Sequence, residues 1–307
     1  MKQDKILIIG AGAIGSFYAA ILSKAGADVS VVCRSDYQTV KQNGFTINSN
    51  DLGNWRFNPS QVITSAAEYI GQADYIILCT KVIPAINRVE LLQSAVNPRT
   101  CIVFIQNGVD IEQELLDAFP NNEIISGLAF ICCTRIAPGI THHLAYGKLS
   151  LGSLNKTPAT SNRTQHLAGL LNQAGVESVV TDKIISNRWL KCLWNASFNP
   201  LSVLSGGLST KEILSTQEPL IRTIMQEVMQ IAEACGHPLE KDSIDINIEN
   251  TYAMPPYKTS MLLDYENHQT MEIEAILGNT LSAAKRQQID SPVLDTLYAL
   301  MKLRQLN

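Results

Sequence analysis

Three polar side chains recur at every fourth residue in an otherwise apolar stretch of the second half of the chain. They are Lys191, Asn195 and Asn199. Residues four apart lie on one face of an α-helix. Asparagine is a poor helix former, so an ordinary solvent-facing stripe would more often carry Glu, Lys, Gln or Ala. The pattern therefore indicates a working surface with one cation and two amides, and a narrow exposed stripe is the alternative.

A glycine-rich turn near the start of the chain has the spacing of a dinucleotide-binding motif. Its sequence is Gly10-Ala11-Gly12-Ala13-Ile14-Gly15, between an apolar run at residues 5–9 and an apolar helical stretch at residues 17–25. In this setting the glycines allow a tight turn, close approach of a pyrophosphate and close packing of the helix. The start of the helix also offers free N–H groups and a positive dipole end. The motif predicts that these residues bind the diphosphate of a nicotinamide dinucleotide.

The end of the second strand indicates which dinucleotide is bound. An acid there would bond the ribose 2′-hydroxyl of NAD, but the strand is followed by Arg34 and Ser35, with no acid before Asp36. Arg34 suits a 2′-phosphate, and Ser35 adds a hydroxyl donor. We therefore expect NADP(H) rather than NAD(H), unless Arg34 is an idle surface residue. Lys81, after a later strand, is either a second cation near the adenosine phosphate or a solvated side chain.

Strands alternate with helices through the first part of the chain. Beyond the motif, strands are expected at residues 28–33, 74–79, 100–105, 123–130, 139–143, 148–151 and 177–181, and helices at 84–94, 111–119 and 163–174. This alternation predicts an α/β fold with a Rossmann-type, doubly wound parallel sheet. Ligands bind beyond the carboxyl ends of such strands, which is where Lys81 and Asn107 fall. Asn107-Gly108 is also a common turn pair.

From residue 183 onward the apolar residues have a helical period. Helices are expected at residues 184–204, with a bend at Pro200, then at 217–235, at 261–286 with Ser260 as N-cap, and at 291–306. On the third of these, Ser260, Asp264, His268 and Glu272 recur every four residues, as a second polar stripe or as a solvated face. We predict two domains: residues 1–182 bind NADP(H), and residues 183–307 form an all-α substrate domain.

Composition excludes several classes of protein. The 307 residues are 46% hydrophobic and 17% charged, with a net charge of -4, which is typical of a globular chain without a basic surface for nucleic acid. No apolar run reaches the roughly 18 residues that span a bilayer, and no signal peptide is apparent, so a cytoplasmic protein is expected. The seven cysteines and five histidines lack metal-ligand spacing, which predicts reduced thiols and no metal. A small molecule is the expected partner.

In order along the chain, these motifs resemble the ketopantoate reductase (2-dehydropantoate 2-reductase) family. The similarity rests on the glycine motif, Asn107-Gly108, Lys191-x-x-x-Asn195-x-x-x-Asn199-Pro200-Leu201, Ser260-Met261-Leu262-x-Asp264 and Glu272, and it covers nearly the whole length. The resemblance implies reduction of 2-dehydropantoate to (R)-pantoate by NADPH, a step of pantothenate and coenzyme A synthesis. We expect the protein to be a monomer or a homodimer.

The resemblance also implies a role for each candidate residue. Lys191 is the general acid, Asn107, Asn195, Asn199 and Ser260 hold substrate, Glu272 contacts substrate or orders the site, and Arg34, Lys81 and again Asn107 meet the cofactor. The chemistry agrees, because hydride delivery to a ketone develops alkoxide charge that a protonated cation stabilises and then neutralises. An amide suits both a carboxylate and a hydroxyl of the substrate. The division of work between Glu272 and Asp264 stays open.

Two other functions fit part of this pattern. A reductase with the same two-domain plan that acts on another 2-keto or 3-hydroxy acid would carry the same motifs, because family membership alone does not fix the substrate. A non-catalytic NADPH-sensing regulator would keep the fold but would not need Lys191.

Overall fold

The computed structural model describes residues 3–156, 162–255 and 257–306 and divides into two compact units. The first unit, the sheet unit, holds Met1–Lys81, Asn87–Gln106 and Glu112–Ile184. The second unit, the helical unit, holds Val82–Ile86, Asn107–Ile111 and Ile185–Asn307. Two short segments from the first part of the sequence thus belong to the helical unit, which the expected division at residue 182 did not include.

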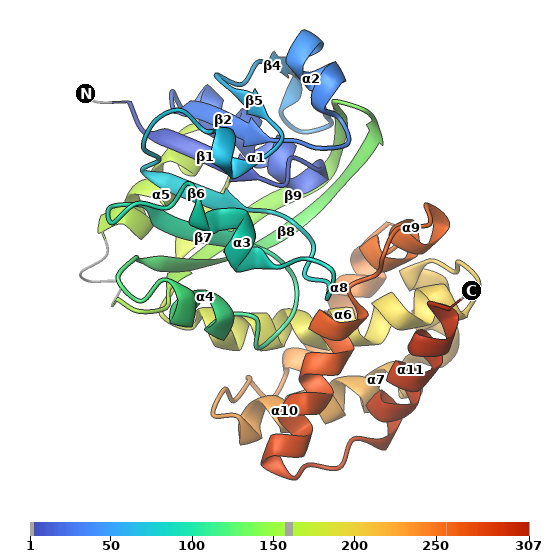
Figure 1. Ribbon diagram of the computed structural model, residues 1–307. Helices are drawn as coiled ribbons and strands as arrows, with labels where there is room; N and C mark the ends of the chain where they lie inside the picture. Colours follow the sequence, from blue (N-terminus) through green and yellow to red (C-terminus); the bar gives the residue numbers. More distant parts are fainter. Residues whose placement is uncertain (1–2, 157–161, 256, 307) are drawn as a thin grey trace. The chain divides into compact units, whose positions relative to one another are not determined.

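A mixed sheet, ten-stranded over the described residues, forms the sheet unit (Figure 1). Its strands are β1 (Lys5–Ile9), β2 (Asp28–Val32), β3 (Phe45–Ser49), β4 (Gly53–Phe57), β5 (Val62–Ile63), β6 (Tyr75–Leu78), β7 (Cys101–Ile105), β8 (Ile124–Ala137), β9 (Ile140–Ser153) and β10 (Ser178–Val180). The neighbours β8, β7, β6, β1, β2 and β5 run parallel in that order. β9 lies antiparallel to β8, and β3, β4 and β10 extend that side. The predicted Rossmann-type fold is confirmed, with a partly antiparallel edge.

Helices surround the strands of this unit. They are α1 (Ala13–Lys24), α2 (Tyr37–Asn43), α3 (Arg88–Gln93), α4 (Gln113–Ala118) and α5 (Asn162–Gln173), with a 3-10 turn at Ala66–Glu68. Phe17 and Tyr18 of α1 are fully buried and belong to one apolar cluster with Ile6 and Ile8 of β1. Strands of a parallel sheet are covered on both faces, which explains why β1 and β6 are almost entirely apolar.

Some predictions for the sheet unit were wrong in the length or the number of the elements. The helix expected at residues 84–94 begins only at Arg88, because the Asn87 side chain caps it by accepting from Glu90 N at 3.1 Å. The three short strands expected between residues 123 and 151 are instead two strands of 14 residues each, β8 and β9. Register shifts interrupt this hairpin, so its side chains do not alternate regularly in burial.

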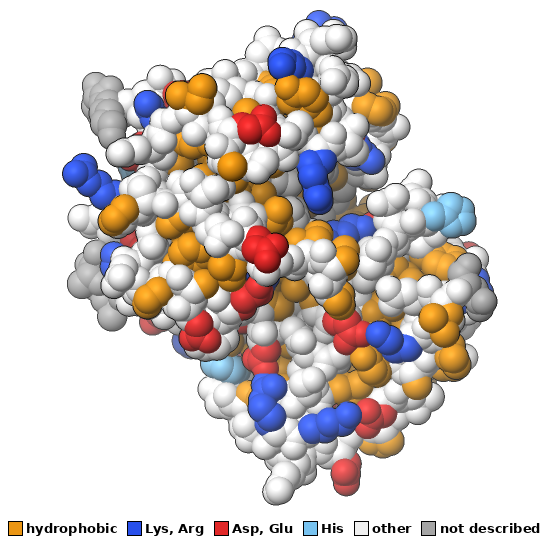
Figure 2. Space-filling model, viewed as in Figure 1, with side chains coloured by type: hydrophobic (Ala, Val, Ile, Leu, Met, Phe, Trp, Pro, Cys, Tyr) orange, Lys and Arg blue, Asp and Glu red, His pale blue; other side chains and the backbone are white. Residues whose placement is uncertain are grey.

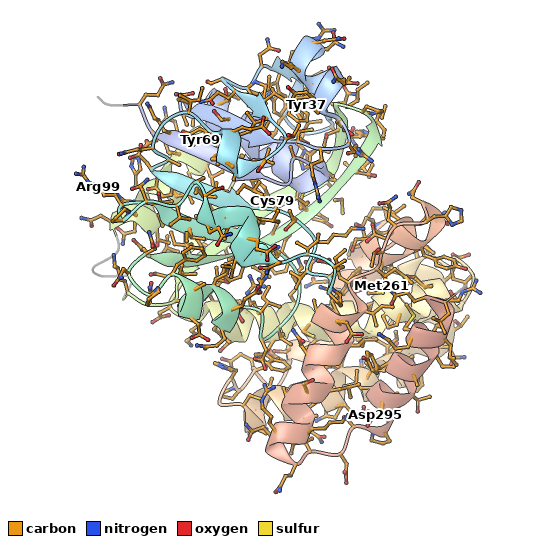
Figure 3. All side chains as sticks on the ribbon, in the orientation of Figure 1. Tyr37, Tyr69, Cys79, Arg99, Met261 and Asp295 are labelled. Atoms are coloured by element: carbon orange, nitrogen blue, oxygen red, sulfur yellow. The ribbon has the colours of Figure 1, made fainter. Side chains whose placement is uncertain are left out.

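The helical unit is built around its own apolar core. Its helices are α6 (Ile184–Leu204, which starts in the sheet unit), α7 (Thr210–Ala234), α8 (Ser243–Ala253), α9 (Ser260–Glu266), a π-helical segment (Glu274–Gly278), α10 (Asn279–Gln287) and α11 (Pro292–Arg304). The predicted α6 is confirmed, with Pro200 inside it. The core includes Trp189 and Phe198 of α6, Val228 of α7 and Met261 of α9. Of these, Met261 is labelled in Figure 3. α7 has non-helical backbone at Gln217, where the sequence predicted a helix to begin.

The single long helix expected at residues 261–286 is wrong. α9 ends at Glu266, and His268 follows with a left-handed φ of 53°, a conformation that stops a helix. The next helical residues begin after Glu272, so the four-residue stripe from Ser260 to Glu272 does not exist. The cap was also misplaced by one residue, because the Thr259 side chain accepts from Leu262 N at 3.2 Å.

Within the described ranges, none of the helices has both the length and the apolar character needed to cross a membrane. Acidic and basic side chains are interspersed over the face seen in Figure 2. That mixture accords with the small net charge of -4.

Candidate functional site

One face of α6 carries the polar residues singled out in the sequence. Lys191 is half-buried, Asn195 is 7% exposed and Asn199 is 1% exposed. Neither amide atom of Asn199 has a hydrogen-bond partner among the described residues. A buried unpaired amide costs about 1–3 kcal/mol, so the fold retains this group at the expense of stability. A solvent-exposed stripe, the alternative for this segment, is excluded.

Glu272 is fixed by two segments of the helical unit that are distant in sequence. One carboxylate oxygen accepts from Val82 N at 2.9 Å, and the other accepts from Asn107 Nδ2 at 3.1 Å. Val82 and Asn107 begin the two short segments that follow the regions of β6 and β7. The carboxylate is therefore oriented by a backbone N–H and a side-chain amide, and Asn107 and Glu272 form one cluster.

Close backbone packing holds the Asn107 turn in place. Gly108 has a φ of 108°, and a Cβ atom there would lie 2.6 Å from the carbonyl oxygen of Ala275. Val109 N donates to the same oxygen at 3.2 Å. Because only glycine accepts both this φ and this contact, the Asn-Gly pair is more than a surface turn. It seats Asn107 against the segment that follows Glu272.

Arg188, which was not among the residues predicted from the sequence, supports the same turn. It is 1% exposed, and its Nη1 donates to the Gly108 carbonyl oxygen at 3.1 Å. Arg188 precedes Lys191 by three residues, so both lie on one face of α6. The three-residue spacing from Lys191 was the one sequence signal that could have identified Arg188. Arg188 was passed over because it stands where the apolar segment begins.

The environment of Lys191 weakens its hold on its proton. Burial, and then the positive charge of Arg188, lower the pKa of Lys191 from 10.5 to about 8, while Glu272 acts in the opposite direction. Burial penalises the ammonium form, and the nearby cation adds to that penalty. A lysine with a pKa near 8 is still mostly protonated at neutral pH and gives up its proton readily. These are the properties of a general acid.

Ser260 and Asp264 lie on α9. Ser260 is exposed at the first position of the helix, and Asp264 is half-buried one turn later. Because α9 ends before Glu272, a common helix face no longer links them to that carboxylate.

The glycine turn of the sheet unit has the form that a dinucleotide diphosphate requires. A Cβ atom at Gly15 would lie 2.2 Å from the Gly10 carbonyl oxygen and 3.2 Å from Cys79 Cβ, the residue that follows β6 and is labelled in Figure 3. Gly10 has a φ of 94°. Gly12 is exposed, with nothing within 4 Å of a Cβ there, and it begins α1 without a side-chain cap. The exposed Gly12 leaves the backbone open to an anion where N–H groups are free.

The rest of that motif lines the turn with small or apolar side chains. Ala11 is buried, and Ala13 and Ile14 are half-buried. No charged group within the motif itself opposes a diphosphate, so the residues present fit the cofactor expected from the sequence.

Beyond β2, the residues expected at the 2′-phosphate differ in exposure. Arg34 is exposed and Lys81 is half-buried at the end of the first segment of the sheet unit. The Ser35 hydroxyl donates to Asp36 Oδ1 at 2.9 Å. Its hydrogen is thus engaged within the protein, which disagrees with its expected use as a free donor. Arg135 of β8 forms an ion pair with Asp36 and was not selected from the sequence.

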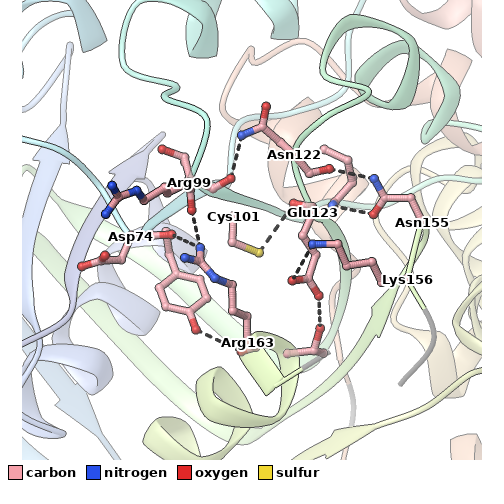
Figure 4. Close-up of polar contacts among 12 residues, drawn as sticks. Asp74, Arg99, Cys101, Asn122, Glu123, Asn155, Lys156 and Arg163 are labelled. Atoms are coloured by element: carbon pink, nitrogen blue, oxygen red, sulfur yellow. Dashed lines mark hydrogen bonds and ion pairs between the residues drawn. The ribbon is translucent and has the colours of Figure 1, made fainter. Parts of the chain in front are cut away.

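A second polar cluster lies at the amino-terminal ends of β6, β7 and β8, the edge opposite the glycine turn (Figure 4). Glu123 is 5% exposed, accepts from Thr164 Oγ1 at 3.1 Å and lies 4.0 Å from Lys156 Nζ. The Arg163 guanidinium donates to the carbonyl oxygens of Asp74 and Arg99. These bonds join α5 to the strand ends, which indicates a structural role. Among the described residues, no group of three or more His, Cys, Asp or Glu could hold a metal ion.

Comparison with known proteins supports the fold and shows the family. The family described as Ketopantoate reductase PanE/ApbA matches residues 6–156, and Ketopantoate reductase PanE/ApbA C terminal matches residues 183–305. A 2-dehydropantoate 2-reductase of Nostoc sp. is 30% identical over 306 residues, which cover 98% of this chain and 95% of the relative.

Solved structures agree. The crystal structure of 2-dehydropantoate 2-reductase from Methylococcus capsulatus has a TM-score of 0.92 and 53% sequence identity, over 98% of this chain and 97% of that chain. D-Mandelate dehydrogenase in a ternary structure with NADH and anilino(oxo)acetate has a TM-score of 0.88, covering 98% of both chains, and its 24% identity shows the fold alone.

The Rossmann-type sheet and these matches define the chain as an oxidoreductase. More closely, it belongs to the ketopantoate reductase family, since the two family matches together span most of its length. The family expected from the sequence motifs is confirmed.

Proposed function

We propose that this protein reduces 2-dehydropantoate to (R)-pantoate with NADPH, in the synthesis of pantothenate and coenzyme A. The proposal is carried by Lys191, a half-buried lysine whose pKa lies near 8 and whose surroundings include the Glu272 carboxylate. Membership of the ketopantoate reductase family and the names of the Nostoc and Methylococcus relatives support the choice of substrate.

In the proposed reaction, Lys191 donates its proton to the ketone oxygen as that oxygen becomes an alkoxide. The ammonium group lies in a low-dielectric setting, where it stabilises developing negative charge more strongly than water would. NADPH, once bound, supplies the hydride to the carbonyl carbon. Proton and hydride together convert the ketone into the secondary alcohol.

Glu272 is proposed to keep Lys191 protonated and correctly placed. Both of its oxygens already accept hydrogen bonds, from Val82 N and Asn107 Nδ2, so its orientation does not depend on substrate. Its charge raises the pKa of Lys191, which opposes the effects of burial and Arg188. The carboxylate therefore acts as a positioning group, and Asn107 is available to substrate or cofactor through its remaining hydrogen-bonding capacity.

Asn195, Asn199 and Ser260 are proposed to bind the substrate carboxylate and hydroxyl. The unpaired amide of Asn199 supports this role, because a buried polar group that finds no partner within the described protein gains one when a polar ligand binds. Its 1% exposure implies that the surrounding side chains must move for that contact to form.

NADPH is proposed to bind at the glycine turn, with residues 10–15 on the diphosphate and Arg34 and Lys81 at the 2′-phosphate. Arg34→Ala should therefore weaken binding of NADPH more than binding of NADH. Equal losses for the two cofactors would refute the role of Arg34.

The function is tested by measuring NADPH oxidation with 2-dehydropantoate and with a panel of other 2-keto acids. We expect the highest kcat/KM with 2-dehydropantoate, and little turnover when NADH replaces NADPH. A clear preference for another keto acid would overturn the assigned substrate. Lys191→Ala that reduces 2-dehydropantoate at an undiminished rate would overturn the assigned acid.

A further inference from the structure

Asp36 is the first acid after β2, near the place where an acid would select NADH. The structure encloses it: the residue is 3% exposed, and both carboxylate oxygens are engaged. Oδ1 accepts from Ser35 Oγ at 2.9 Å and from Arg135 Nη1, and Oδ2 accepts from Gly139 N at 3.0 Å. The carboxylate is thus turned toward the β8–β9 hairpin.

Arg135 supplies the charge that balances this acid. It lies near the end of β8, and its side chain is 42% exposed while that of Asp36 is 3% exposed. The same Nη1 also donates to Ser35 Oγ at 3.2 Å. Arg135 therefore contacts both residues that follow Arg34, and the exposed part of its guanidinium contributes positive charge beside them.

A bare carboxylate in this loop would disfavour NADPH in two ways. Its charge would repel the 2′-phosphate, and its oxygens would be available to the 2′-hydroxyl of NADH. With Arg135 present, the negative charge of Asp36 is neutralised and both of its carboxylate oxygens are occupied. The exposed Arg34 and the exposed part of the Arg135 guanidinium then carry the charge that a cofactor meets in this loop.

We propose that Arg135 is a positioning residue for cofactor selection, which neutralises Asp36 and holds it against Gly139 so that the loop after β2 accepts a 2′-phosphate. The inference rests on the NADP(H) preference in the proposed function. It assigns part of the selectivity to a residue about a hundred positions away from β2, on the β8–β9 hairpin.

The test is a series in which the formal charge of the 36/135 pair is varied. Arg135→Met makes the pair negative, and Asp36→Asn makes it positive. Arg135→Lys and the double variant Arg135→Met with Asp36→Asn keep it neutral. Dissociation constants for NADPH and NADH are measured for each full-length protein by fluorescence titration, without substrate, so that catalysis does not enter the result.

We expect the ratio of the NADH to the NADPH dissociation constant to follow the charge of the pair. Arg135→Met should lower this ratio by about tenfold, the scale of one charge interaction near a protein surface. Asp36→Asn should raise it, and the two neutral variants should stay within about threefold of the unaltered protein. Arg56→Met, which removes an exposed charge from β4 of the same unit, is the matched control and should leave the ratio unchanged.

A ratio that is the same in the neutral and charged variants would overturn the inference, as would equal weakening of both cofactors by Arg135→Met. If Arg135→Met does not fold because Asp36 loses its partner, the other three variants still decide, since they leave no unbalanced buried carboxylate. Unaltered protein that binds NADH more tightly than NADPH would instead overturn the proposed function.

Discussion

Replacing Lys191 with methionine should strongly reduce turnover and at the same time stabilise the protein at neutral pH. Burial and Arg188 lower the pKa of the lysine from 10.5 to about 8. At about 1.36 kcal/mol for each pKa unit, this difference corresponds to roughly 3 kcal/mol of stability that the folded protein forgoes while the group is charged. Methionine fills similar space without a charge, so the variant regains up to that amount.

The predicted gain has a defined pH dependence. The unfolded chain holds the proton of Lys191 more tightly than the folded chain does, so the stability of the unaltered protein rises with pH between about 8 and 10.5. Below that window the cost is fully present, and above it the cost is gone. The advantage of Lys191→Met should be largest at pH 7 and should shrink as the pH approaches 10.5.

The assay is denaturant unfolding at a series of pH values, followed by tryptophan fluorescence. Trp189 and Trp194 lie on α6 and report on the helical unit. Lys211→Met is the control, because Lys211 is exposed on α7 of the same unit. An unfolding midpoint for Lys191→Met at or below that of the unaltered protein at pH 7, or an advantage that does not change with pH, would refute the reasoning. Turnover of the variant should fall by about 10²–10⁴-fold.

Three further changes test the surroundings of Lys191 and the glycine turn. Glu272→Gln removes the charge that raises the pKa of Lys191, so the basic limb of the kcat/KM profile should move to lower pH. Arg188→Met removes a cation that lowers this pKa, so the same limb should move to higher pH. Gly15→Ala places a Cβ atom 2.2 Å from the Gly10 carbonyl oxygen, so NADPH affinity in a fluorescence titration should fall by more than about tenfold.

Each of these predictions has a clear contrary result. If the basic limb of the kcat/KM profile does not move, or moves in the same direction in Glu272→Gln and Arg188→Met, the charges of these two residues do not act on the titrating group. Gly169→Ala is the control for the glycine turn, because nothing lies within 4 Å of a Cβ at that position of α5. NADPH affinity should be unchanged in it, and equal losses in both alanine variants would contradict the role of Gly15.

The features predicted well from the sequence are those whose signal is local. The glycine motif between a strand and a helix is contiguous, and α6 shows its period and its polar face within one segment. The local pattern gave a wrong prediction at residues 261–286, which were expected to form one helix. His268 adopts a left-handed backbone conformation there, and the helix ends before it. Such a stop is not encoded by glycine or proline there, so periodicity alone did not reveal it.

Contacts between segments far apart in the sequence could not be predicted in this way. The bond from Asn107 to Glu272 and the ion pair from Arg135 to Asp36 join residues about a hundred or more positions apart. Asn107 was selected from its place after a strand and Glu272 from a four-residue polar repeat, and the family resemblance then implied a role for each. None of these signals gives the distance between the two residues. Arg135 lies on a long, irregular hairpin for which only short strands were expected, so its register was unknown and its partner could not be inferred.

The chain passes between the two units five times, after residues 81, 86, 106, 111 and 184. A fragment that starts at residue 185 would contain Lys191 and Glu272 but would lack Val82 and Asn107, the two donors that hold the carboxylate. The helical half is therefore not a portable module. Truncation or recombination after residue 184 would separate Lys191 and Glu272 from Val82 and Asn107, the two groups that orient the Glu272 carboxylate. A chimera with another member of the family should exchange Val82–Ile86 and Asn107–Ile111 together with the helices.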